Sequence, residues 1–266
     1  MISPASSPSR WISFFLLLIS ICSLQVSAQP STLALSEEMV NASNRFIAGL
    51  NQLQRSRALF EFDSEERLNW HFIPRDRQGV PYSSMSESQR AAAVELLQLF
   101  FSDAGYRKTE NVRSLELVLA EIEINGRFER NPELYYFSFF GEPSMDGPWA
   151  FRYEGHHLAF NWTFAGGDGI ASSPQFFGSN PAEVRSGNRI GLRVLAAEED
   201  MARDIVLSFS DSQQRQGVLD VDVPRDILTA ARVDIEPLEN QGIPYSDLNS
   251  GQKLALIRLI EEVASA

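Results

Sequence analysis

The chain has 266 residues, of which 44% are apolar, 11% are aromatic and 22% are charged. This composition provides enough apolar side chain for a large core and excludes a disordered, collagen-like or coiled-coil protein. The formal net charge is −12 and no cluster of Lys and Arg is visible, so we expect neither nucleic acid nor an anionic membrane as a partner.

The first 28 residues have the order of a secretory signal peptide. Arg10 closes a short polar stretch, residues 11–24 are apolar, and residues 26–28 are small. The apolar run is shorter than the roughly 20 residues of a membrane-spanning helix, so we expect cleavage after Ala28 and a secreted or periplasmic protein without a membrane anchor. Cleavage also removes Cys22, the one cysteine, which excludes disulfides and thiolate metal ligands.

A degenerate internal repeat organises the chain at an offset of about 163. The sequence GVPYSSMSESQR of residues 79–90 returns as GIPYSDLNSGQK in residues 242–253. In both copies a Gly-x-Pro turn precedes a capping box, in which Ser86 or Asn249 stands three residues before a glutamine. We therefore predict a turn and a capped amphipathic helix in each copy.

A weaker repeat lies upstream of each turn. Residues 42–58 align with residues 202–218 at an offset of 160. Met39, Phe46 and Leu50 give the first of these segments a helical apolar stripe, so we predict one helix over residues 42–58. Each unit is then expected to contain a helix, a connection, a turn and a second helix.

The stretch between the two units is rich in aromatic residues, glycine and asparagine, and predicts strands. Residues 134–140 have the aromatic density of a buried strand. Residues 149–164 are predicted as one second strand, followed by a hairpin turn at Gly166–Gly169.

The sequence therefore predicts an α+β protein in which helical units flank a mainly antiparallel, aromatic-rich sheet. The second unit would carry a sheet of its own beyond Ala266, so it is expected to be a truncated module. The expected organisation is a signal peptide followed by one compact domain (29–266) made of helical unit 1 (29–133), a sheet region (134–195) and helical unit 2 (196–266).

The histidines suggest a metal site. In a regular strand, Arg152, Glu154 and His156 share one face, and Tyr153, His157 and Asn161 lie on the other. Glu154 and His156, with His71 as third ligand, would form a two-histidine, one-carboxylate site of the kind that holds zinc, iron or copper. The alternative is an Arg152–Glu154 ion pair beside a half-buried His156, with His157 hydrogen-bonded across the sheet. No diagnostic spacing such as H-E-x-x-H decides for the metal.

A second hypothesis is a binding cleft. Each tryptophan of the mature chain lies near a histidine in sequence, and an aromatic cleft could take a small molecule or a carbohydrate. The candidate binding residues are Trp70, Arg75, Trp149, His157 and Asn161, with Trp162 as the third tryptophan.

Residues 65–77, EERLNWHFIPRDR, place charges around an apolar centre. Arg67, Arg75 and Arg77 could receive a carboxylate or a sugar acid at a pocket wall. The alternative is a strand with a rim of salt bridges. The chain lacks a G-x-S-x-G elbow, a Walker loop and a G-x-G-x-x-G turn, which argues against the enzyme classes that depend on them.

Several short motifs resemble a bacterial family catalogued as domain of unknown function 3500. In chain order they are Glu66–Pro74 (ERLNWHFIP), Gly79-x-Pro, Leu134–Tyr136 through Ser144, Gly147–Trp149, Glu154–His157, Phe176–Pro181 and Leu195–Glu199. The resemblance brings no activity with it. It implies a further C-terminal portion with a His-x-His block, which this chain does not reach, so a truncated or inactive product is expected.

Two functions remain open. The first is a metal-dependent enzyme that acts on a small extracytoplasmic substrate through His71, Glu154, His156 and His157. The second is a non-catalytic protein that binds a small molecule or carbohydrate in an aromatic cleft.

Overall fold

The computed structural model describes residues 32–220, 222–237 and 239–265. The expected signal peptide, residues 1–28, lies outside the described residues.

A mixed sheet of seven strands forms the centre of the described structure. The strand order is β1-β3-β4-β5-β6, with β2 also paired to β3 and β7 also paired to β5. Every pairing is antiparallel except that of β1 with β3. The strands are β1 (Leu59–Phe60), β2 (Val80–Pro81), β3 (Tyr136–Phe140), β4 (Trp149–Gly155), β5 (Leu158–Phe164), β6 (Ile170–Ala171) and β7 (Gln175–Phe177).

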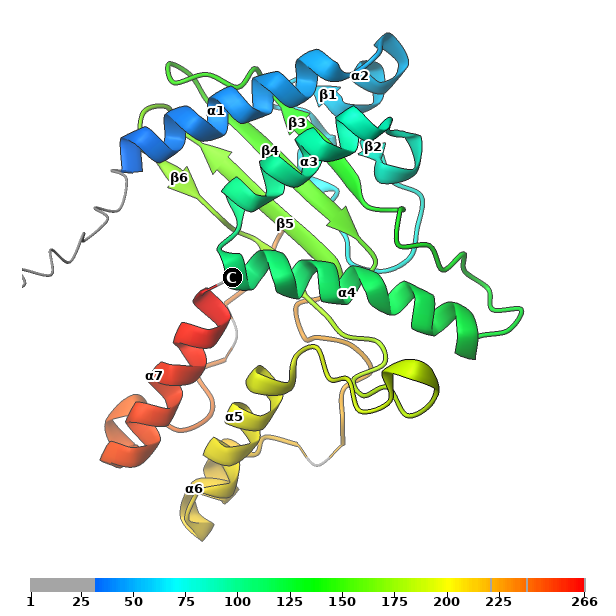
Figure 1. Cartoon of the computed structure of the whole chain (residues 1–266). Coiled ribbons are helices and arrows are strands. Elements are labelled where there is room, and N and C mark those ends of the chain that lie inside the picture. The colour runs from blue at the N-terminus through cyan, green and yellow to red at the C-terminus, as the bar shows by residue number, and fades with distance from the viewer. Residues whose placement is uncertain (1–31, 221, 238, 266) are drawn as a thin grey trace, which may run out of the picture. The chain divides into compact units, whose positions relative to one another are not determined.

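Seven α-helices accompany the sheet in the described residues. Helices α1 and α3 lie next to each other across one face of the sheet, and α4 lies at one end of that face (Figure 1). The helices are α1 (Thr32–Gly49), α2 (Gln52–Ala58), α3 (Glu87–Phe100), α4 (Asp103–Ile122), α5 (Ala196–Leu207), α6 (Asp211–Gly217) and α7 (Ser250–Ala264). The predicted α+β class is confirmed.

Aromatic side chains fill the core between this face of the sheet and the helices. Phe46 of α1 stacks on Phe137 of β3, with ring centroids 5.3 Å apart. Phe100 of α3 packs edge-on against Phe151 of β4 at 4.8 Å and against Trp162 of β5 at 5.1 Å. Since side chains alternate along a strand, the residues between these aromatics point to the other face of the sheet.

The prediction of a single strand over residues 149–164 is wrong. The chain reverses at His156 and His157, which form the two-residue turn between β4 and β5. His157 has a φ of 61°, a left-handed conformation that tight hairpins require. The alternation therefore restarts after the turn, and Asn161 pairs directly with Arg152 instead of lying on the opposite face. The hairpin predicted at Gly166–Gly169 is confirmed, because it joins β5 to β6.

The predicted helix over residues 42–58 is two helices. Asn51 starts α2 with a capping box of its own. The Asn51 side chain accepts the backbone N–H of Gln54, and the Gln54 side chain accepts the backbone N–H of Asn51. This local cap competes with continuation of α1, so the chain bends after Gly49. The capping boxes predicted at Ser86 and Asn249 are both confirmed.

A pair of glutamines locks the first helical unit. The buried Gln54 of α2 and Gln89 of α3 each donate to the side-chain oxygen of the other, at 3.1 and 2.8 Å. Gln54 also donates to Ser84 O at 2.8 Å, and Gln89 donates to Gly49 O at 2.8 Å. One side-chain pair therefore joins α2 and α3 to the end of α1.

The second helical unit has the same set of bonds. Gln213 of α6 and Gln252 of α7 donate to each other's side-chain oxygens at 3.0 and 3.1 Å. Gln252 donates to Ser208 O at 3.0 Å, and Gln213 donates to Asp247 O at 3.2 Å. Four apolar side chains of α7 are nevertheless exposed, whereas four of α3 are buried in the core. The exposed ones are Leu254, Ile257, Ile260 and Val263, and the buried ones are Ala93, Leu96, Leu97 and Phe100.

We predict that Gln54→Ala destabilises the fold. The substitution removes the bonds to Ser84, Gln89 and the Asn51 cap, and it leaves buried polar groups without partners, so the free energy of unfolding should fall by about 1–3 kcal/mol. Urea unfolding measures the change. Gln52→Ala, at an exposed position in the first turn of the same helix, is the matched control. An equal loss in both variants would contradict the role of the glutamine pair.

Candidate functional site

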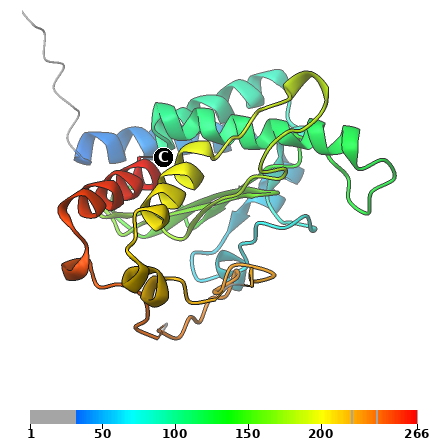
Figure 2. The ribbon, with the colours of Figure 1, turned by 90° about the horizontal axis from the view of Figure 1, so that it is seen from below.

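The face of the sheet opposite α1, α3 and α4 carries the candidate site. Two separate segments lie over this face: the chain near residues 60–80 and the chain near residues 225–237 (Figure 2). Phe140, Arg152, Glu154 and Asn161 are on this side of the strands, because their neighbours in sequence pack against the helices.

A buried carboxylate anchors the first covering segment to the sheet. Glu154 of β4 lies with one carboxylate oxygen 2.9 Å from Arg152 Nε and the other 3.4 Å from Arg77 Nε. The second oxygen also accepts the backbone N–H of His71 at 2.9 Å. All three charged side chains are at most 3% exposed, so the shared Glu154 carboxylate offsets the repulsion between the two buried cations.

The two arginines extend this contact along the covering segment. Arg77 donates to the carbonyl oxygens of His71 at 2.8 Å, Ile73 at 2.6 Å and Gly155 at 3.0 Å. Arg152 donates to Glu66 O at 2.6 Å and pairs with the Glu66 carboxylate at 2.5 Å. Burial lowers the pKa of Arg77, with Glu154 acting in the opposite direction. The network therefore fixes the segment from Glu66 to Arg77 over the sheet.

The three residues of the metal hypothesis are engaged separately. His71 Nδ1 accepts the N–H groups of Phe72 at 3.0 Å and Ile73 at 3.2 Å, and the Glu154 oxygens face arginines. His156 Nδ1 lies 2.5 Å from Glu116 Oε1 of α4. In the described parts of the chain, no group of three or more His, Cys, Asp or Glu side chains is arranged to hold a metal ion. The alternative ion pair between Arg152 and Glu154 is formed.

The expected cleft of three tryptophans does not form. Trp149 and Trp162 point into the core on the helix side of the sheet, where Trp149 stacks on Phe164 at 4.0 Å and Trp162 stacks on Phe151 at 5.4 Å. Trp70 alone is half-buried on the open face. The reversal at His156 places Trp162 on the same face of the sheet as Trp149, and this face packs against the helices.

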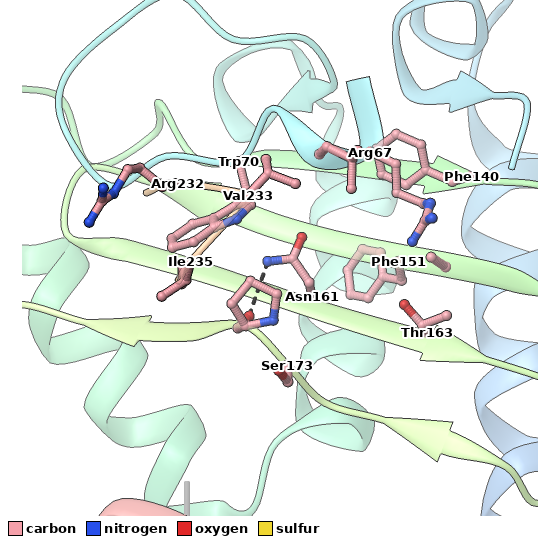
Figure 3. A pocket seen from close by; sticks show the side chains of 13 residues that line it. Arg67, Trp70, Phe140, Phe151, Asn161, Thr163, Ser173, Arg232, Val233 and Ile235 are labelled. Carbon is pink, nitrogen blue, oxygen red and sulfur yellow. Dashed lines mark hydrogen bonds between the residues drawn. The ribbon is translucent and has the colours of Figure 1, made fainter. Parts of the chain in front are cut away.

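A pocket of about 300 Å³ lies between the sheet and the two covering segments. Its floor is made by strands β3, β4 and β5 and by Pro174, and its walls come from the segment near Trp70 and from residues 232–235. Figure 3 shows Trp70 and Arg67 on either side of Asn161. The residues that line it are Arg67, Leu68, Trp70, Phe140, Ala150, Phe151, Asn161, Thr163, Ser173, Pro174, Arg232, Val233 and Ile235.

The polar groups of this pocket, here called the Trp70 pocket, are held in place. The Asn161 side-chain nitrogen donates to Pro174 O at 3.1 Å, which fixes the amide and leaves its oxygen facing the pocket (Figure 3). Arg67 Nε donates to Phe62 O at 2.9 Å, and its guanidinium lies over the Phe62 ring at 4.7 Å. The site thus combines the half-buried indole of Trp70 with the fixed side chains of Asn161 and Arg67.

A second pocket of about 460 Å³ lies at the other end of the covering segment. It is lined by Arg75, Arg77, Glu116 and His156, among others, and so brings charges of both signs together. Arg75 therefore belongs to this pocket and not to the Trp70 pocket, and its guanidinium already donates to Asn69 Oδ1 at 2.6 Å.

Some site residues had a signal in the sequence and others had none. Thr163 stands two positions after Asn161 and so shares its face, and Glu116 interrupts an apolar helical stripe of α4. Arg232 follows no periodic pattern, because its place is set by a connection between α6 and α7.

The fold and the pocket define an α+β protein with a small cavity on the open face of an aromatic, mainly antiparallel sheet. The chain matches the family model described as "Protein of unknown function (DUF3500)" over residues 33–265, so it belongs to this family, as its motifs indicate. No curated protein and no solved structure matches the chain significantly. Among the helices that the structure describes, none has the length and apolar character needed to span a membrane.

We predict that Glu154→Gln destabilises the protein strongly. The substitution keeps the shape of the side chain but removes the carboxylate partner of the buried Arg77 and one of the two partners of Arg152, so the free energy of unfolding should fall by about 3–5 kcal/mol. Glu95→Gln breaks an exposed pair with Arg45 and should cost at most about 1 kcal/mol. Similar losses for both variants in urea unfolding would argue against the anchoring role of Glu154.

His157 should make stability depend on pH. Burial, and then the neighbouring His156 and Arg130, lower the pKa of His157 from its ordinary 6.5 to about 4. The unfolded chain therefore takes up this proton before the folded chain does. The free energy of unfolding is therefore highest above pH 6.5, where His157 is neutral in both states. It decreases by on the order of 2 kcal/mol as the pH falls toward 4.

Urea unfolding at pH 7.5 and pH 4.5 tests this prediction with His157→Asn, since asparagine tolerates the left-handed backbone at this position. The variant should lose less stability on acidification than the wild type. An unchanged pH dependence would show that His157 does not contribute.

Proposed function

We propose that this chain is an exported, non-catalytic binding protein that takes a small carbohydrate-like solute in the Trp70 pocket. The observation that carries the proposal is the half-buried indole of Trp70 beside the fixed amide of Asn161, over a floor of sheet residues. The proposal of export depends on the signal peptide expected in residues 1–28.

The chemistry of the pocket suits a sugar ring. A sugar presents C–H groups on one face and hydroxyl groups around its edge, and an indole packs against the first while amides and hydroxyls bind the second. Asn161, Thr163 and Ser173 supply such groups, and Trp70 supplies the aromatic surface. The volume of about 300 Å³ lies at the small end of ligand pockets, which favours a ligand of one or two rings.

The same geometry supports binding better than the metal-dependent enzyme. A metal on His71, Glu154 and His156 would have to displace two arginines from Glu154 and to bring together side chains that now face different partners. Breaking those buried ion pairs is costly. The Trp70 pocket needs no such rearrangement before a ligand enters.

The test is binding by wild type and Trp70→Ala. Isothermal titration with glucose, galactose and their uronates should give saturable binding to the wild type, accompanied by a change in tryptophan fluorescence. In Trp70→Ala the affinity should fall at least tenfold, because the stacking surface is removed.

Tyr245→Ala is the matched control, since Tyr245 is an exposed aromatic residue outside the pocket. Circular dichroism checks that both variants are folded. The proposal is wrong if the wild type binds none of the sugars, or if Trp70→Ala binds them as well as Tyr245→Ala does.

A further inference from the structure

The Trp70 pocket is cationic, although the protein as a whole is acidic. Arg67 and Arg232 line it, and none of the described lining residues is Asp or Glu. The chain carries a formal net charge of −12. The charge of the pocket is therefore opposite in sign to the net charge of the chain. A positive potential in a concave site attracts anions.

The guanidinium of Arg67 is oriented but not neutralised. Its Nε is bound to the carbonyl of Phe62, and its plane lies over the Phe62 ring. Among the described residues, no carboxylate lies within ion-pair distance of Arg67, because the adjacent Glu66 is paired with Arg152 instead. The buried network therefore engages the carboxylate adjacent in sequence and leaves two terminal nitrogens of Arg67 for another partner.

Those nitrogens stand on the pocket side of the segment. In Figure 3 the guanidinium of Arg67 extends from the covering segment toward Phe151 and Thr163 of the sheet. A planar guanidinium with its terminal nitrogens exposed matches the two oxygens of a carboxylate. Arg232 lines the opposite end of the same pocket and adds to the positive potential.

We infer that the ligand is a sugar acid, whose carboxylate binds Arg67 while its ring packs on Trp70. This inference rests on the proposed function and adds the charge of the ligand to it. Neutral sugars of the same size should bind the same pocket more weakly, since they leave Arg67 without a counter-ion.

The experiment compares matched acidic and neutral ligands on the full chain. Isothermal titration is carried out with glucuronate against glucose and with galacturonate against galactose, at low and at high salt. The wild type should bind each acid at least tenfold more tightly than its neutral partner, and the preference should decrease at high salt because the attraction is screened.

Arg67→Gln should remove most of this preference, measured as the ratio of the affinities of the same variant for the acid and for its neutral partner. Arg57→Gln is the matched control, because it removes one positive charge at an exposed position of α2 outside the pocket. It should keep the full preference for acids. Thermal unfolding of both variants verifies that the fold is intact.

The outcomes separate the two proposals. Equal affinity for acidic and neutral sugars in the wild type, or a full preference for acids in Arg67→Gln, overturns the assignment of a sugar acid while binding in the Trp70 pocket stands. Absence of binding for every sugar overturns both. An acid preference that depends on Arg67, together with an affinity that falls at least tenfold in Trp70→Ala, supports both.

Discussion

The Glu154 carboxylate is the interaction on which the open face of the sheet depends. It is buried between Arg77 and Arg152 and also accepts the backbone N–H of His71. Without it the buried Arg77 would lose its carboxylate partner, which is costly, whereas Arg152 would keep its pair with Glu66. Since Arg77 then binds three carbonyl oxygens, one carboxylate determines the path of the whole segment over the sheet.

This arrangement separates the charges that stabilise the fold from those available to a ligand. Glu66 and Glu154 neutralise Arg152 and Arg77 inside the protein. Arg67, one residue after Glu66, lines the pocket, and its side chain donates to the Phe62 carbonyl and lies over the Phe62 ring. The dense charge of residues 65–77 therefore includes both salt bridges and a pocket wall. The strand that the sequence offered as an alternative is wrong, because the segment forms a short 3-10 helix (Glu65–Leu68) and irregular chain.

Local patterns in the sequence predicted local structure well and failed where distant segments meet. The capping boxes at Ser86 and Asn249 depend on residues three apart, so their spacing was sufficient. The turn at His156 and His157 was missed because histidine is not a typical turn residue and Gly155 lies before the turn instead of in it, and the missed turn placed Asn161 on the wrong face. The partner of His156 is Glu116, 40 positions away on α4, and no local pattern could identify that contact.

The pocket joins the two helical units of the chain. Its floor belongs to the sheet that packs on α1 and α3, whereas Arg232, Val233 and Ile235 belong to the connection that runs from α6 toward α7. Gln213 and Gln252 hold α6 and α7 together at the two ends of this connection, just as Gln54 and Gln89 hold the first unit. The second unit therefore contributes to the site, because its hydrogen-bonded helices fix the ends of a segment that forms one wall of the Trp70 pocket. The pocket forms because two similar helical units flank one sheet. A sequence pattern within one segment cannot predict the wall from residues 232–235, because this wall meets the sheet only in the folded chain.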